Sequence, residues 1–231
     1  MPVRTKKKRI AWMITGVIVV TALLLYAFVF VNDKPGGLAD WRMSRAMGLK
    51  GTIQIPLGKT PEDAVQQFRN DPSMQVIHRE PVDGGFLLFI KRFYQKDGND
   101  LQVEYARKTW LGWKWGWGGG YGIGESLQTK AALNYMSIPG VEGVSTPFPI
   151  VFGDVLNPSI NKVTVETKGK DTGNYEAKLT ELNIENRIWF VLLPSADYTS
   201  FEIKGFNAEG KLIANKTISD LRDSGSIDLS D

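Results

Sequence analysis

Residues 10 to 31 read IAWMITGVIVVTALLLYAFVFV, a run of 22 residues without a charge that decides how the chain is organised. With a helical rise of about 1.5 Å per residue, this run spans roughly 33 Å, enough for a hydrocarbon core of about 30 Å. It predicts a transmembrane helix at Ile10 to Val31. The lipid bilayer is therefore an expected partner, which the chain contacts through Ile10 to Val31. The residues just before it include five basic ones, namely Arg4, Lys6, Lys7, Lys8 and Arg9. The positive-inside rule then predicts a cytoplasmic tail at 1–9 and an extracytoplasmic part at 32–231.

A cleaved signal peptide is the alternative to an uncleaved signal-anchor. Signal peptides have an apolar region of about 7 to 15 residues, followed by a small-x-small cleavage site. The run here is longer and ends in Phe28-Val29-Phe30-Val31, which favours the anchor. The chain has no cysteine, which excludes a lipid anchor on cysteine, disulfides and thiolate metal sites.

Charge excludes one large class of function. The whole chain carries 28 basic and 25 acidic residues, and five of the basic ones precede the apolar run. The part beyond Val31 therefore holds 23 basic and 25 acidic residues, a net charge of −2. A nucleic-acid binder would concentrate positive charge on its surface, so we expect no nucleic-acid partner.

Residues 32–51 are interpreted as a juxtamembrane connector. Pro35-Gly36-Gly37 ends the membrane helix, and Ala39 to Met47 has a composition compatible with a short helix. Trp41, Arg42 and Arg45 are suited to the outer headgroup region, where amphipathic side chains are favoured. The stretch is therefore predicted either to lie on the membrane surface as a collar or to act as an ordinary tether.

Residues 52–124 are predicted to form a small α+β domain. Thr60 is an N-cap with Pro61 at the first helical position, and the helix ends before Asn70-Asp71-Pro72. Three strands are then predicted, with turns at Asp83-Gly84-Gly85 and Asp97-Gly98: Met74 to Glu80, Phe86 to Gln95, and Leu101 to Thr109. The second strand is apolar at both alternations, which predicts a central strand covered on both faces.

The most unusual stretch is Trp110 to Gly124, in which aromatic residues alternate with glycine. An extended conformation would place Trp113, Trp115, Trp117 and Tyr121 on one face and nearly bare backbone on the other. These four residues are the candidate ligand-binding residues, as a platform for the sugar rings of wall polymers or for a protein partner. The alternative, which we favour, is that they fill the core opposite the Thr60 helix while the glycines let the strand curl.

The rest of the chain is predicted to be mostly β-structure. Residues 125–143 are interpreted as a linker with a short helix, because Leu127, Ala131, Ala132 and Tyr135 have a rough helical spacing. Six short strands between turn signals in 144–219 predict a β-sandwich of immunoglobulin or fibronectin type III kind, with Trp189 in its core. Residues 220–231 are predicted to be a polar tail. A domain boundary is expected near Gly143.

Catalytic signals are weak. His78 is the only histidine, which excludes sites with two histidine ligands and permits a Ser-His-Asp triad only through that residue. Glycoside cleavage needs two carboxylates, and candidates chosen by proximity alone are Glu80, Asp83, Asp100 and Glu104. The glycines of 116–124 lack the Lys-Ser/Thr of a phosphate-binding loop. We therefore expect a non-catalytic protein without a cofactor, and a hydrolase is the least favoured alternative.

Four features together resemble a group of proteins. They are the Lys6 to Arg9 tail with one spanning helix, the run Thr60-Pro61-Glu62-Asp63-Ala64-Val65, the segment Trp110-Leu111-Gly112-Trp113-Lys114-Trp115, and the strand-rich end. The chain in this respect resembles uncharacterised single-pass membrane-anchored extracytoplasmic proteins of Gram-positive bacilli. The resemblance implies a location and brings no functional residues.

Two functions follow as expectations. In the first, the part outside the membrane is an interaction module that binds another envelope protein or a second copy of the chain. In the second, it binds cell-wall glycan through Trp113, Trp115, Trp117 and Tyr121. Solvent exposure of these side chains distinguishes the two.

Overall fold

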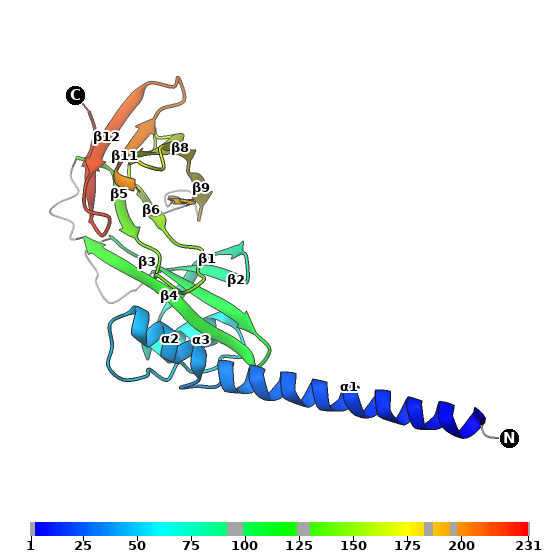
Figure 1. The fold of residues 1–231 in the computed structure, drawn as a ribbon. Coiled ribbons are helices and arrows are strands. Elements are labelled where there is room, and N and C mark those ends of the chain that lie inside the picture. Colours follow the sequence, from blue (N-terminus) through cyan, green and yellow to red (C-terminus); the bar gives the residue numbers. More distant parts are fainter. Residues whose placement is uncertain (1–2, 92–98, 124–129, 183–186, 195–197, 231) are drawn as a thin grey trace.

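A computed structural model describes residues 3–91, 99–123, 130–182, 187–194 and 198–230. Helix α1 (Val3–Asp33) projects from the rest of the molecule (Figure 1). From Trp12 onward its apolar side chains are exposed, and it is long and apolar enough to cross a membrane. The remaining chain is rich in strands, and all the strand pairs of its sheets are antiparallel.

The first sheet lies nearest α1. Its order is β1-β2-β3-β4, and its strands are β1 (Gln75–Val82), β2 (Gly85–Lys91), β3 (Asn99–Thr109) and β4 (Gly112–Ile123). Helix α3 (Pro61–Arg69) packs on β3 and β4, and its N-cap is confirmed because the Asp63 N–H donates to Thr60 Oγ1 at 3.1 Å. Helix α2 (Leu38–Ala46) confirms the predicted connector helix. The predicted turn Asp97-Gly98 lies outside the described residues.

Two further sheets follow. The middle sheet has the order β13-β5-β6-β10-β9, with β5 (Ala131–Ile138), β6 (Ile150–Val155), β9 (Lys178–Glu181), β10 (Arg187–Leu192) and β13 (Ser224–Asp228). The outer sheet has the order β12-β11-β7-β8, with β7 (Lys162–Gly169), β8 (Gly173–Glu176), β11 (Tyr198–Phe206) and β12 (Leu212–Ile218). The sequence around Glu209-Gly210 also predicts a hairpin between the last two of the six short strands, and the pairing of β11 with β12 confirms it.

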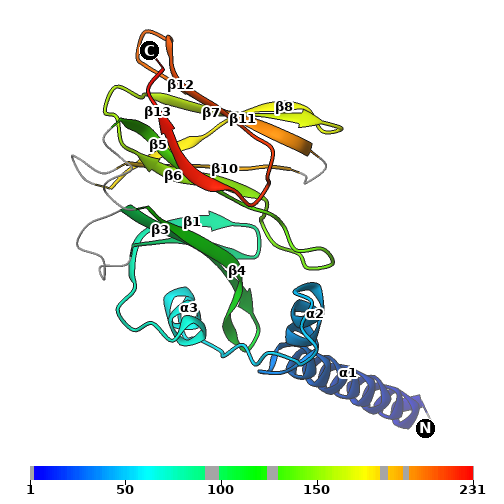
Figure 2. The ribbon, with the colours of Figure 1, turned by 90° about the vertical axis from the view of Figure 1, so that its left-hand side faces the viewer.

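The three sheets are stacked, and α3 covers the free face of the first one (Figure 2). One core lies between α3 and the first sheet and contains Leu88 and Trp115. A second core joins the first sheet to the middle sheet through Phe89 and Phe152. A third lies between the middle and outer sheets and contains Trp189, which is fully buried as predicted. Because the middle sheet is covered on both faces, its inner strands β5, β6 and β10 are buried along nearly their whole length.

Strand β2 shows why its apolar pattern correctly predicted a buried, central position in the first sheet. Leu87 and Phe89 belong to the core shared with the middle sheet, whereas Leu88 and Ile90 face the α3 side. The strand also has a neighbour on each edge. The prediction of a central strand covered on both faces is confirmed.

The predicted helix in residues 125–143 is wrong. Residues 131–138 form β5, which lies between β13 and β6, and nearly every one of its side chains is buried. A short apolar run of this kind is compatible with either a strand or a helix segment, and burial on both faces decides for the strand. The polar tail predicted at 220–231 is also corrected, because Ser224–Asp228 forms β13 and pairs with β5.

The boundary expected near Gly143 therefore cuts through one sheet. We expect a fragment of residues 144–231 to remain unfolded, because it lacks β5 and the first sheet, and so exposes the apolar face around Phe152 and Phe190. Circular dichroism with thermal melting measures this, with residues 32–231 as the control that melts cooperatively. Cooperative melting of the short fragment would show that the middle and outer sheets fold without β5.

Candidate functional site

The aromatic stripe of β4 does not occupy one face of the strand. In the register of β3 and β4, Ala106 lies opposite Trp115 and Tyr105 lies opposite Trp117, so Gly116 is an inserted residue. A β-bulge of this kind reverses the alternation of side chains beyond it. Trp115 consequently packs toward α3, and Tyr121 packs between the first and middle sheets. The prediction that these residues share one face is wrong.

Trp115 is a core residue with 2% of its surface exposed. Its ring stacks on Phe68 of α3 with a centroid distance of 3.9 Å and an interplanar angle of 12°. Its indole N–H donates to Glu104 Oε2 at 2.5 Å, and the Arg69 guanidinium lies 5.3 Å from the ring centroid. These contacts leave no face of the ring for a ligand.

Glu104 anchors this cluster from β3. Its side chain is fully buried, and Oε1 lies 2.6 Å from Arg69 Nη2. Burial raises the pKa of Glu104, while Arg69 and the N–H groups of Trp115 and Gln102 act in the opposite direction. A β-carbon at residue 118 would collide with the Glu104 carboxylate, which explains one glycine of the stretch.

Tyr121 is also buried, with 8% of its surface exposed. Its hydroxyl donates to Asp154 Oδ2 at 2.9 Å and accepts from the Asp154 backbone N–H at 3.1 Å, while Lys91 Nζ lies 3.3 Å from the other carboxylate oxygen. Burial raises the pKa of Tyr121 well above its usual value, and the Asp154 carboxylate adds to this. The residue joins the first sheet to the middle sheet, so it does not lie on an open surface.

Trp117 has a different environment from Trp115 and Tyr121. It is half-buried, and its indole N–H donates to the Pro139 carbonyl at 3.0 Å, which fixes the orientation of the ring. The ring lines a groove of about 600 Å³ between the edge of β4, the segment that follows β5 and the end of α2. The groove is lined by Ala46, Met47, Trp117, Gly118, Gly119, Met136, Ser137, Ile138, Pro139, Gly140, Val141, Glu142 and Arg222.

The groove runs along the edge of the first sheet. β4 is the last strand in that sheet, and its beginning is covered because the N–H and C=O of Trp113 both bond to Gly58. Arg69 Nη2 donates to the Gly118 carbonyl at 3.2 Å. Beyond this point Gly120 and Gly122 are exposed, and no described strand pairs with this edge. A free strand edge offers a row of backbone donors and acceptors to another chain.

One buried polar atom of the groove lacks a partner within the described part of the chain. Ser137 lines the groove and has 1% of its surface exposed, and its hydroxyl makes no hydrogen bond there. A buried polar group without a partner is costly and is often satisfied by a ligand or water. Arg222 and Glu142 are exposed at the rim and add one charge of each sign.

A second polar cluster joins α1 and α2 to β3 and β4. Lys114 is fully buried, and its Nζ lies 2.5 Å from Asp40 Oδ1 of α2 and donates to the Asp33 carbonyl at 3.1 Å. The Arg107 guanidinium donates to Asp33 Oδ1 at 2.9 Å. Burial lowers the pKa of Lys114, and Asp40 opposes that effect. Sequence reasoning missed this cluster, for which the only signal was a lysine within an aromatic and glycine run.

The predicted membrane-surface residues are all on α2. Trp41 is 46% exposed, and the Arg45 guanidinium lies 6.0 Å from its ring centroid. Arg42 lines a cavity of about 320 Å³ between α2 and the first sheet. All three are on the helix that directly follows α1 in the chain.

Glu80 and Glu104, two of the candidate carboxylates, do not share one site. Glu80 of β1 lies opposite Leu87 of β2, and Glu104 of β3 lies opposite Leu88 of β2. Because Leu87 and Leu88 point to opposite faces, the two carboxylates lie on opposite faces of the first sheet. Glu80 also binds Lys178 at 2.7 Å and His78 at 3.2 Å. His78 packs against Phe89 and Phe190. In the part of the chain that the structure describes, no group of three or more His, Asp or Glu side chains is placed to hold a metal.

Comparison of the chain with protein-family models, curated proteins and solved structures gives no match. The groove and α1 are therefore the features of the molecule that bear on its function.

Proposed function

We propose that this protein is a single-pass membrane protein whose part outside the membrane binds an extended polypeptide at the free edge of β4. The polypeptide is a segment of another envelope protein or of a second copy of the chain, and the protein acts as a non-catalytic interaction module. The observation that carries the proposal is the groove of about 600 Å³ beside a strand edge with which no described strand pairs.

The groove suits an added strand. Peptides that extend a sheet bind through backbone hydrogen bonds, and pockets for alternate side chains supply specificity. Gly120 and Gly122 are exposed, and the absence of a side chain there leaves the β4 backbone accessible to another chain. Trp117, Met136 and Met47 provide apolar surface for side chains of the bound segment, and methionine adapts to different shapes.

The proposed orientation places residues 32–231 outside the cytoplasm. The five basic residues before Ile10 support it through the positive-inside rule, and the length of the apolar run supports an uncleaved signal-anchor. The resemblance to membrane-anchored extracytoplasmic proteins agrees with the same location.

This orientation makes a direct prediction. Protease added to intact protoplasts should digest the chain beyond Asn32 and spare an epitope tag at the N-terminus, because only the tail of residues 1–9 lies inside. Immunoblotting for tags at both ends measures this, and lysed protoplasts serve as the control for cleavage of the inner tag. Protection of a C-terminal tag in intact protoplasts would contradict the orientation.

The binding site is tested by photo-crosslinking. A photoreactive amino acid at Met47, which is 38% exposed at the groove, should give an adduct of defined mass in native membranes. Arg222→Glu should reduce the yield of this adduct, whereas Lys211→Glu should leave it unchanged, since Lys211 is an exposed residue beside the β11–β12 turn. Both substitutions reverse one exposed charge, so neither should alter stability by more than about 0.5 kcal/mol.

The mass of the adduct distinguishes a second copy from another protein. Absence of an adduct from Met47, or equal effects of the two charge reversals, would overturn the proposed site.

Glycan binding is the second candidate, supported by the half-buried Trp117 ring on the groove. Sugar rings pack on indole faces, but Trp115 and Tyr121 are buried and Trp113 packs beside Phe86 on the α3 side, so Trp117 is the one ring of the four that lines the groove. On this alternative, Trp117→Ala should abolish retention of the protein on purified wall polymer. On the peptide-binding proposal, no such retention exists in the parent protein.

We also propose that the middle and outer sheets together form a β-sandwich of immunoglobulin or fibronectin type III kind, and that α3 with the first sheet forms an α+β unit. The two facing antiparallel sheets around Trp189 support the first assignment. In this arrangement the sandwich is the membrane-distal part and the groove lies between the two units.

A further inference from the structure

The turn between β3 and β4 carries an unusual side chain. Trp110 is 91% exposed, more than any other large apolar side chain in the described part of the chain. A single exposed apolar residue on a soluble protein needs no explanation. The turn that carries Trp110, however, is next to the end of α1, a helix long and apolar enough to cross a membrane.

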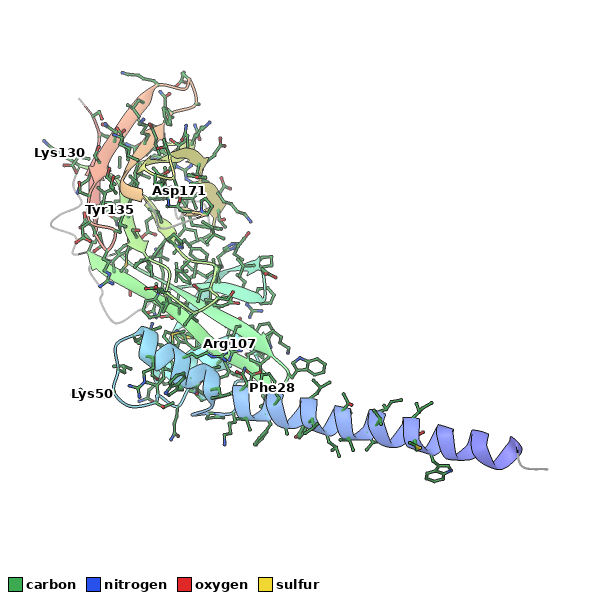
Figure 3. All side chains as sticks on the ribbon, viewed as in Figure 1. Phe28, Lys50, Arg107, Lys130, Tyr135 and Asp171 are labelled. Atoms are coloured by element: carbon green, nitrogen blue, oxygen red, sulfur yellow. The ribbon has the colours of Figure 1, made fainter. Side chains whose placement is uncertain are left out.

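Contacts on both strands fix the turn next to the end of α1. Arg107 of β3 and Lys114 of β4 both bond to Asp33, the last residue of α1, at 2.9 Å and 3.1 Å. Figure 3 shows the labelled Arg107 close to the labelled Phe28, and Figure 1 shows this end of the first sheet beside α1.

Distances along the backbone give the depth of the turn. Trp110 lies three residues beyond Arg107, which is about 10 Å in a strand. Figures 1 and 2 show the β3–β4 hairpin pointing in the direction in which α1 runs toward its N-terminus. The same length along α1 covers roughly six to seven residues back from Asp33, and so reaches the level of the last apolar turns. If α1 spans a membrane, the outer membrane–water interface is therefore at the same position along the α1 axis as Trp110.

The chemistry around the turn also fits a lipid surface. Trp41 is exposed on α2, and the exposed basic residues Lys34 and Lys108 flank α1 and the turn. Tryptophan is enriched at membrane interfaces, where its ring is in the apolar region and its N–H faces water, and lysines there meet lipid phosphates. Together these residues form an aromatic and basic rim around the end of α1.

We propose that the β3–β4 turn inserts into the outer headgroup layer of the membrane that α1 crosses, with Trp110 as its anchor. This second point of contact, in addition to α1, holds the first sheet at a fixed tilt to the membrane. It rests on the proposed membrane span and is independent of what binds at the groove.

The absence of cysteine allows a clean test on the full chain. Single cysteines at Leu111, Leu24 and Glu209 are labelled with a fluorophore, and the protein is reconstituted in vesicles of phosphatidylethanolamine and phosphatidylglycerol. Lipids with a nitroxide near the headgroup or deep in the acyl chain then act as quenchers. We expect the label at Leu111 to be quenched by the shallow nitroxide, the label at Leu24 by the deep one, and the label at Glu209 by neither.

Trp110→Ser should abolish the shallow quenching at Leu111 and leave the melting temperature unchanged, because the side chain is exposed. If the label at Leu111 behaves like that at Glu209 while Leu24 is quenched, the inserted turn is wrong and the membrane span stands. If the label at Leu24 is not quenched, the membrane span itself is wrong. If the fluorescence of the label at Leu111 changes with the density of protein in the vesicles and not with the nitroxide lipids, Trp110 contacts a second copy of the chain. That result would overturn the lipid contact.

Discussion

Trp115→Ala should reduce the free energy of unfolding by about 3 to 5 kcal/mol, comparable to much of the stability of a small domain. The substitution removes a buried ring that stacks on Phe68 and lies beside Arg69. It also deletes the N–H that donates to Glu104, a carboxylate that is fully buried. Loss of packing and loss of a hydrogen bond to a buried charge therefore act together.

Chemical denaturation of the full chain in detergent measures this effect. Trp110→Ala is the matched control, since it removes an indole from the same hairpin at a position that is 91% exposed and should change the free energy by less than about 0.5 kcal/mol. A Trp115→Ala protein as stable as this control would mean that the ring is accessible, and it would favour the binding platform over the core.

Asp40→Ala should be comparably destabilising, by about 3 to 5 kcal/mol, because it leaves the Lys114 ammonium buried without its carboxylate. The other oxygen of Asp40 also accepts the backbone N–H groups of Gly36 and Ile55 at 2.8 and 3.0 Å. Lys114→Met should reduce the free energy of unfolding by less, since it removes one donor to Asp40 and leaves the two backbone N–H donors in place.

A double-mutant cycle separates the pair from its surroundings. Asp40→Ala combined with Lys114→Met should cost clearly less than the sum of the two single substitutions, because neither partner is then left as an uncompensated charge. Additive effects would show that the buried pair does not join α2 to β4. Denaturation of all three variants in the same detergent gives the comparison.

Local signals in the sequence predicted much of the fold. The charge-free run of α1, the Thr60 cap of α3 and the apolar β2 strand each depend on residues that are close in sequence. Strand β5 was missed because a short buried apolar segment carries no periodicity that separates helix from strand. Its two neighbours, β13 and β6, supply the backbone pairing that makes it a strand, and the cores on either side of the middle sheet bury its side chains. β13 lies almost 90 residues further along the chain.

The candidate site was less accessible to sequence reasoning. Alternation along β4 fails at Gly116, where one inserted residue turns Trp115 and Tyr121 to opposite faces of the sheet. The groove depends on Trp117, Met47 and Arg222 coming together from distant parts of the chain. The pairing of Lys114 with Asp40 is likewise set by tertiary structure, so no spacing in the sequence indicates it.

Binding of an added strand at the edge of β4 is tested most directly by hydrogen exchange. The protein crosslinked through Met47 is compared with the free protein by mass spectrometry of peptides that cover residues 117–122, on an edge with which no described strand pairs. Backbone N–H groups on such an edge exchange fast, and a strand added to it protects them. We predict slower exchange of residues 117–122 in the adduct, with no change in the β11–β12 hairpin. Unchanged exchange of residues 117–122, with new protection elsewhere, would contradict binding at this edge.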